Sequence, residues 1–155
     1  NENIRFGDIN KQPDNQTIEQ AAKHAGIDDL LRRMPNEYKT VLGNFFVSGE
    51  ELSTGQWQKV ALARAFFRDA PVIIFDEPTS SMDAQSEHDF YCKIRQLIKG
   101  KTALLISHRF STVKLADMIY VLNACKVAES GTHNDLMQKN GIYAAMYRLQ
   151  SKNYR

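Results

Sequence analysis

The sequence is poor in cysteine, and its two cysteines fall in no pattern that would build a site. Cys92 and Cys125 form no CxxC pair, and neither has a histidine at the spacing used by metal sites. A disulfide framework and a structural zinc site are therefore excluded as the basis of the fold. We expect a reducing compartment, with both thiols simply packed among other side chains.

The sequence also lacks a long apolar segment and a block of like charge. No apolar run approaches the roughly 20 residues that span a bilayer, and the opening Asn1-Glu2-Asn3 does not begin a signal peptide. The 20 basic and 18 acidic residues are dispersed and give a net charge of +2, without a basic arm or an acidic tail. The chain itself is therefore expected to be soluble, and no nucleic-acid partner is expected.

What remains is an ordinary globular composition, 155 residues long and 43% apolar, which is enough for one domain with a buried core. The pattern changes near Ala70, from signals that start and stop helices to alternating strands and helices. We therefore predict two parts of one α/β domain, a helical part over residues 1–70 and a layered part over residues 71–155.

Capping boxes mark the helices of the first part. Thr17-Ile18-Glu19-Gln20 predicts the start of a helix that Gly26 stops, and Asp28 is expected to cap a shorter turn. Ser53-Thr54-Gly55-Gln56 predicts the start of a mostly apolar helix that ends near Asp69. Both boxes indicate that this part is mainly helical.

The segment over residues 40–52 shows neither strand alternation nor helical spacing, which favours a loop or a short irregular strand. Phe45 and Phe46 lie within it. They are interpreted either as docking residues for a partner or as a satellite core, and the sequence does not decide between the two.

The second part alternates apolar strands with helices. The runs Val72-Ile73-Ile74-Phe75 and Ala103-Leu104-Leu105-Ile106 predict two parallel strands, joined by a helix over 84–98 that Asp83 caps. This is a βαβ unit. A terminal hairpin over 118–129 and closing helices over 134–139 and 142–150 are predicted after it.

Polar residues follow both predicted strands, at the edge where open parallel sheets bind ligands. The pair Asp76-Glu77 follows the first strand, and Ser107-His108 follows the second. Adjacent carboxylates at the end of a buried strand are costly unless a cation pairs with them. We therefore interpret Asp76 as a metal ligand acting through water, Glu77 as a general base and His108 as a donor to an anion. The alternative is that the carboxylates only begin a loop and that His108 only packs.

A second anion site is predicted where Ser53-Thr54-Gly55-Gln56 opens a helix. Free N–H groups and the positive end of the helix dipole bind phosphate there, and Gly55 lets an anion approach the backbone closely. The alternative is a simple N-cap in which Ser53 and Gln56 exchange hydrogen bonds.

Taken together and in order, these motifs resemble the ATP-binding cassette of ABC transporters. They are Leu52-Ser53-Thr54-Gly55-Gln56, the run from Val72 through Glu77 to Ser80, Ser80-Ser81-Met82-Asp83, and Ser107-His108-Arg109. The resemblance identifies them as the signature motif, the Walker B strand with its catalytic glutamate, the D-loop and the switch histidine, and it covers essentially the whole chain. It implies a P-loop NTPase fold, with a partial RecA-like parallel-sheet core and an α-helical subdomain.

The resemblance also implies ATP and Mg²⁺ as cofactors, with three residues of this chain around them. Asp76 would hold Mg²⁺ through water. Glu77 would polarise the attacking water, and His108 would bind the γ-phosphate and help to position that water.

Other residues would act on a second cassette. The resemblance implies that Ser53, Gly55 and Gln56 contact ATP held by that partner, and that Asp83 meets it at the dimer interface. The implied partners are this second nucleotide-binding domain and the coupling helices of a transmembrane domain, at the cytoplasmic side of a membrane. Thr54 stands where the family usually has glycine, so we expect looser contact with phosphate rather than its loss.

The opening Glu2-Asn3-Ile4-Arg5-Phe6-Gly7 resembles the segment after the Q-loop of exporter-type cassettes. The Walker A loop, which holds the phosphates, is then expected upstream, and the chain alone is expected to be inactive. The leading hypothesis is the ATP-hydrolysing part of an ABC exporter. The alternatives are a soluble ABC ATPase of DNA repair or translation, and a non-catalytic interaction module with the cassette shape.

Overall fold

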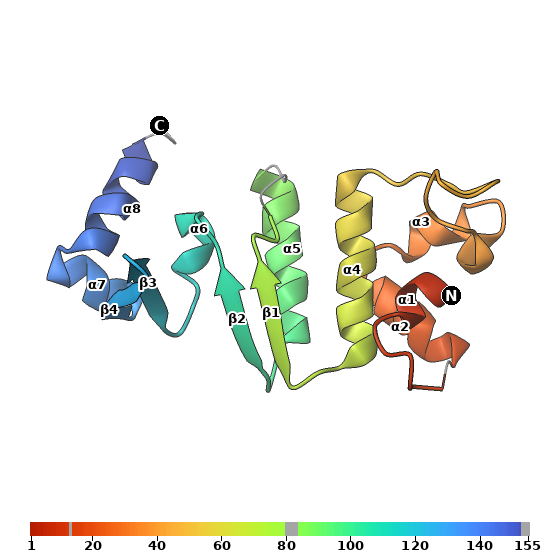
Figure 1. Cartoon of the computed structure of the whole chain (residues 1–155), viewed down its shortest axis with the longest axis horizontal. Coiled ribbons are helices and arrows are strands. Elements are labelled where there is room, and N and C mark those ends of the chain that lie inside the picture. Colours follow the sequence, from red (N-terminus) through yellow and green to blue (C-terminus); the bar gives the residue numbers. More distant parts are fainter. Residues whose placement is uncertain (13, 80–83, 153–155) are drawn as a thin grey trace. The chain divides into compact units, whose positions relative to one another are not determined.

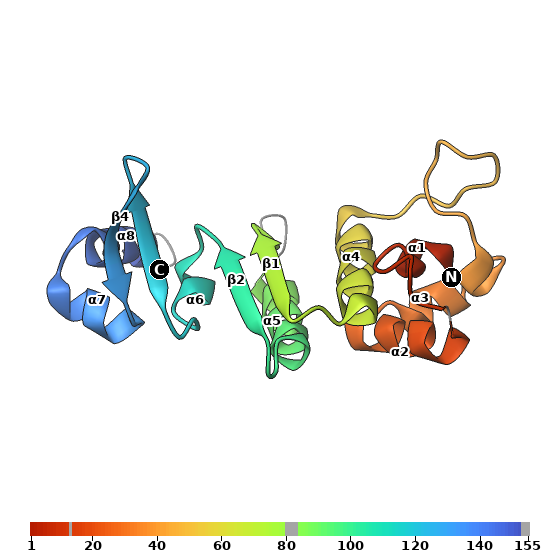
Figure 2. The same ribbon diagram turned by 60° about the horizontal axis from the view of Figure 1, so that its bottom comes forward.

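The computed structural model describes residues 1–12, 14–79 and 84–152, which form two compact units, Asn1–Leu104 and Leu105–Arg155. The ribbon of each unit is shown from two directions in Figures 1 and 2. Among the helices of the described residues, none has the length and apolar character needed to cross a membrane.

Helix α4 (Thr54–Arg68) is the central helix of the first unit's helical layer. Helices α1 (Glu2–Arg5) and α2 (Asn15–Ala25) pack against it, and both views show them beside it. The layer is completed by α3 (Asp28–Arg32), which Asp28 begins rather than caps, and by the 3₁₀ helix η1 (Glu37–Lys39). Its buried apolar side chains include Ile4, Ile18, Ala22, Val60, Leu62, Ala63 and Phe67.

The start of α2 differs from the prediction. Asp14 is the N-cap residue, and its carboxylate accepts a hydrogen bond from the Gln16 N–H at 3.2 Å. The Thr17 hydroxyl donates to the same carboxylate at 3.2 Å, so the predicted capping box at Thr17 is wrong. Aspartate is at least as good a cap as threonine, and Asp14 stands earlier in the chain. The predicted stop is confirmed, because Gly26 takes the left-handed conformation, with φ of 70°.

The segment that precedes α4 is irregular, as predicted, and contains an isolated bridge between Leu42 and Glu50. Phe45 is 96% exposed and Phe46 is 61% exposed, and the neighbouring Val47 is exposed as well. The satellite-core interpretation of the two phenylalanines is therefore wrong. Their role in docking stays a prediction.

Strand β1 (Val72–Asp76) pairs with β2 (Thr102–Ile106), and Figure 1 shows the two arrows pointing the same way. Helix α5 (Ala84–Leu97) connects them, so the predicted βαβ unit is confirmed. Its predicted cap, Asp83, lies outside the described residues. Within β1, burial alternates because successive side chains point to opposite faces: Ile73 and Phe75 are buried, and the residues on either side of each are exposed.

The second unit is built on the antiparallel hairpin of β3 (Ile119–Asn123) and β4 (Lys126–Gly131). Helices α7 (His133–Lys139) and α8 (Ile142–Lys152) follow. The predicted hairpin and closing helices are thus confirmed. The buried core of this unit includes the cluster of Ile119, Leu136 and Tyr143.

Neither cysteine lies in the interior, and neither is disulfide-bonded. Cys92 is exposed on α5, whose inward face is defined by the buried Phe90, Ile94 and Leu97. Cys125 is exposed in the turn of the hairpin. The prediction that both thiols pack among other side chains is therefore wrong.

A buried carboxylate ties the end of the hairpin to α8. Glu129 on β4 accepts hydrogen bonds from the N–H groups of Ile142, at 2.9 Å, and Tyr143, at 3.0 Å. A Cβ on Gly141 would lie 1.8 Å from the Glu129 Oε1, so this close approach requires glycine. Glu129 thereby caps the first turn of α8 from another element.

The same contacts predict how the second unit responds to acid. The two N–H donors lower the pKa of the Glu129 carboxyl below its ordinary 4.5, with Lys139 assisting. A lowered folded-state pKa contributes stability that is complete above the unfolded-state pKa and is lost as pH falls through the folded-state pKa. We expect the protection of the Tyr143 amide against hydrogen exchange to fall, after correction for intrinsic exchange rates, as pH drops below about 4.5. Glu129→Gln should flatten this dependence, and an unchanged profile in that variant would contradict the assignment.

Candidate functional site

The N-terminus of α4 carries the predicted signature residues in a closed capping box. The Ser53 N–H donates to the Gln56 Oε1 at 2.8 Å, and the Gln56 N–H donates to the Ser53 Oγ at 3.3 Å. The simple N-cap interpretation is therefore correct as far as it goes. The capping box does not use the full hydrogen-bonding capacity of Ser53, because a hydroxyl that accepts one hydrogen bond still has its own proton to donate.

Gly55 lies in the first turn of α4 and is exposed. A Cβ built on it would meet nothing within 4 Å in the chain. No contact among the described residues therefore requires glycine at this position. The open space above this turn can admit an external anion against the N–H groups of the helix end.

Asp76 and Glu77 stand at the carboxyl end of β1. Asp76 is the exposed last residue of the strand, and Glu77 follows with a left-handed φ of 46°. A non-glycine residue in that conformation is strained, and such strain is commonest at functional sites. The positive φ turns the chain directly after the strand.

Thr79 anchors the loop that follows, and the sequence analysis did not single it out. It is buried, its Oγ1 donates to the Glu87 carboxylate at 3.3 Å, and it lies 3.3 Å from the Tyr91 hydroxyl. Both partners belong to α5. These contacts tie the loop after Glu77 to α5. The sequence did not indicate which residues of α5 make them.

His108 is exposed and follows β2, in the second unit. Beside it, the Arg109 N–H donates to the Ser107 Oγ at 3.0 Å. The short helix α6 (Phe110–Val113) begins directly afterwards. The predicted interface residue Asp83 lies outside the described residues.

The first unit brings two of the predicted groups to one edge. Figure 1 shows α4 and β1 running in opposite directions, so the beginning of α4 and the end of β1 both lie at the upper edge of this unit. The Ser53 turn and the Asp76-Glu77 pair therefore stand at element ends that point to the same side of the unit. The position of His108 is described within the second unit, to which it belongs.

The carboxyl end of β1 suits a magnesium ion that is also held by ligands from outside the chain. In the described ranges, no cluster of three or more His, Cys, Asp or Glu side chains is placed to hold a metal ion. Mg²⁺ commonly takes only one or two carboxylates from a protein and completes its octahedron with water and substrate phosphates. Asp76 has the chemistry for that limited role, which leaves Glu77 for the predicted role of general base.

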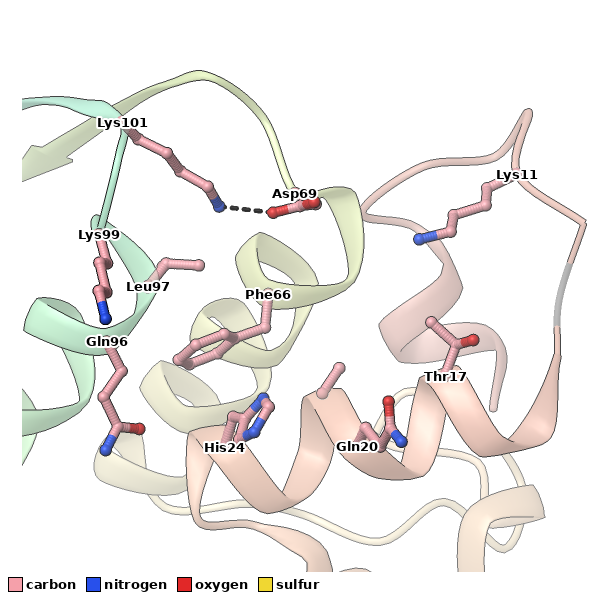
Figure 3. Close-up of a pocket in the computed structure, with 11 residues that line it drawn as sticks. Lys11, Thr17, Gln20, His24, Phe66, Asp69, Gln96, Leu97, Lys99 and Lys101 are labelled. Carbon is pink, nitrogen blue, oxygen red and sulfur yellow. Dashed lines mark ion pairs between the residues drawn. The ribbon is translucent and has the colours of Figure 1, made fainter.

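A separate pocket of about 490 Å³ opens on the first unit, between α2, α4 and the end of α5 (Figure 3). Two of the lysines that line it are engaged: the Lys101 Nζ lies 2.7 Å from the Asp69 carboxylate, and the Lys11 Nζ donates to the Phe67 carbonyl at 3.1 Å. None of the described site residues lines it. This pocket is not the predicted nucleotide site.

Comparison with known proteins shows the family of this chain. Residues 2–80 match the family model described as ABC transporter. The chain is 40% identical over 148 residues to the ATP-dependent lipid A-core flippase of Chromohalobacter salexigens, and 41% identical over 147 residues to that of Alcanivorax borkumensis. These alignments cover 96% and 95% of this chain and 25% of each relative, so the chain spans about a quarter of their length.

A solved structure agrees with the sequence relatives. The structure of a bacterial Atm1-family ABC exporter with ATP bound matches with a TM-score of 0.81 and 35% identity, over 96% of this chain and 25% of that one. The fold is therefore the ABC ATPase fold of the P-loop NTPase class, as predicted. On the matched family model and these relatives, the chain belongs to the ABC transporter family.

Proposed function

We propose that this chain is the signature and Walker B portion of the ATP-hydrolysing domain of an ABC exporter. The observations that carry the proposal are the open first turn of α4 and the carboxylates at the end of β1, two ends that point to the same side of the first unit in Figure 1. Relatives named as ATP-dependent flippases favour an exporter with a lipid substrate over a soluble ABC ATPase.

In the proposed reaction, ATP and Mg²⁺ bind at the end of β1. Asp76 holds the ion through water, and Glu77 takes a proton from the water that attacks the γ-phosphate. His108 donates to the γ-phosphate. The bound Mg²⁺ supplies neutralisation of the charge that develops on the phosphate oxygens.

A second cassette completes the site. Ser53, Gly55 and Gln56 present the α4 N-terminus to ATP held by the partner, and Asp83 meets that partner at the interface. ATP then joins two cassettes, and its hydrolysis lets them separate and drives a transmembrane domain through its coupling helices. We place the exposed Phe45 and Phe46 at that transmembrane contact, on the cytoplasmic side of the membrane.

The test is ATP turnover by this chain and by a version extended upstream through a Walker A loop, both with Mg²⁺. We expect hydrolysis by the extended version only, because the Walker A backbone and lysine hold the β- and γ-phosphates. Failure of both versions to bind ATP would contradict the proposal and favour a non-catalytic interaction module.

Gly55→Ala separates the proposed partner contact from folding. A methyl group there meets nothing within 4 Å, and alanine is the better helix former by up to about 1 kcal/mol, so the variant should be at least as stable as the parent. ATP-dependent dimerisation and turnover should nevertheless weaken several-fold, because the methyl group intrudes on the partner's phosphate. Gel filtration with ATP and a turnover assay check this. Unchanged turnover would rule out the proposed close approach at Gly55.

A further inference from the structure

A single side chain at the end of α8 holds the backbone that directly follows the His108 Cα. The Gln150 Nε2 donates to the His108 carbonyl at 3.0 Å, and the Gln150 Oε1 accepts from the Phe110 N–H at 2.9 Å. The two bonds reach across 42 and 40 positions of sequence. All of these residues belong to the second unit.

Both bonds meet a need of the backbone there. Phe110 begins α6, and its N–H is one of the first-turn donors that a helix cannot satisfy internally. Arg109 occupies the N-cap position, and its side chain makes no capping hydrogen bond. Gln150 supplies the missing acceptor. A carboxamide suits this place because it is donor and acceptor at once.

The position of Gln150 is set by the rest of α8. Tyr143, Tyr147 and Gln150 are spaced i, i+4 and i+7, so they share one face of the helix. The Phe110 ring packs edge-on against that face, with centroids 5.3 Å from Tyr143 and 5.5 Å from Tyr147. Tyr143 is buried, and Glu129 caps the start of the helix. The helix is thus anchored at its first turn and presents Gln150 to the His108 segment.

We infer that Gln150 is a positioning residue for His108, which makes α8 a support of the catalytic site. This inference rests on the role proposed for His108 above. Gln150 does not touch the reacting atoms. It fixes the peptide group on the C-terminal side of the His108 Cα and the next peptide along the chain, and the geometry of catalytic groups must hold to well within 1 Å.

The kinetic test uses the ATP-hydrolysing protein that contains this chain. Gln150→Ala is expected to lower kcat about tenfold with the KM for ATP little changed, because positioning acts on the chemical step. Gln150→Glu keeps an acceptor for Phe110 but sets a carboxylate against the His108 carbonyl, so it should not restore activity. Gln138→Ala, which removes an exposed glutamine from the neighbouring α7, is the matched control and should behave as the parent.

A double-mutant cycle shows whether the effect passes through His108. If it does, Gln150→Ala lowers kcat in the parent but adds nothing in a His108→Ala background. An equal loss in both backgrounds, or no loss in the parent when His108→Ala itself reduces kcat, would overturn the inference.

Hydrogen exchange on this chain gives a readout independent of turnover. The Phe110 amide should be protected in the parent and in Gln138→Ala, and should lose most of that protection in Gln150→Ala, while the Tyr143 amide keeps its own. An unprotected Phe110 amide in the parent would overturn the inference. Normal protection together with a kcat that does not respond to His108→Ala would instead refute the proposed role of His108.

Discussion

Replacing Glu77 by glutamine in the ATP-hydrolysing protein is expected to lower kcat by about 10²–10⁴-fold while ATP binding is retained, because the change removes the proposed general base. The substitution is nearly isosteric. It also leaves the demand for a left-handed φ at this position unchanged, since both side chains are unbranched at Cβ. The loss therefore isolates the carboxylate from the backbone strain around it.

Single-turnover kinetics and ATP binding measured side by side check this result. Glu37→Gln is the control, because Glu37 is exposed in η1 and also has a positive φ, of 47°. Glu37→Gln should therefore turn over ATP as the parent does, and equal losses in the two variants would show that the effect is not specific to the Glu77 carboxylate. Unchanged turnover in Glu77→Gln would refute the assignment of the base.

Replacing Phe67 by alanine is expected to destabilise the first unit by about 3–5 kcal/mol, the range for deleting a buried aromatic ring. Phe67 is 1% exposed, on the face of α4 that packs against the other helices of the layer. The Lys11 ammonium lies 4.9 Å from the centre of the Phe67 ring and also donates to the Phe67 carbonyl. The deletion therefore leaves a cavity and loosens the segment between α1 and α2.

Urea unfolding monitored by tryptophan fluorescence measures this loss in the first unit, because the one tryptophan of the sequence, Trp57, lies on α4. The control is Phe45→Ala, which removes the same ring from a site that is 96% exposed. That variant should change the unfolding free energy by no more than about 0.5 kcal/mol. A small loss in Phe67→Ala would mean that α4 is not the packing centre of the unit.

The elements that the sequence predicted correctly are those decided by local chemistry. Ser53 and Gln56 are three residues apart, so their capping box could be read directly from the chain, and the structure has both of its bonds. Gly26 is a similar case. At Thr17 the same reasoning failed because a competing cap, Asp14, stands nearby, and local rules do not decide between two adequate caps.

Contacts between distant parts of the chain could not be predicted. Nothing in the spacing of Tyr143, Tyr147 and Gln150 indicates that their face receives the His108 segment, although the spacing itself is visible. The anchoring of Thr79 on α5 is hidden in the same way. The exposure of Cys92 depends on which face of α5 packs inward, and composition alone does not reveal that.

The candidate site was predicted as residue types at strand and helix ends, and the family comparison supports the motif series as a whole. The roles proposed for the site residues require ligands that no single segment of the chain supplies. A magnesium ion held by Asp76 needs phosphate oxygens to complete its shell, and the Ser53 turn needs a nucleotide that the partner cassette holds. For this reason the assignments remain proposals, and the variants above are their tests.

Helix α4 is long enough for a small rotation at one end to displace its other end appreciably. Its 15 residues make a rod about 22 Å long, with the Ser53 turn at one end and Asp69, which pairs with Lys101 ahead of β2, at the other. Asp69 is 73% exposed, so this ion pair is a weak tether rather than a rigid joint. A tilt of about 5° around that end would carry the Ser53 turn through about 2 Å, more than half the length of a hydrogen bond. Because α1 and α2 pack against α4, such a rotation would carry the helical layer as a whole, and it would engage or release whatever the Ser53 turn holds.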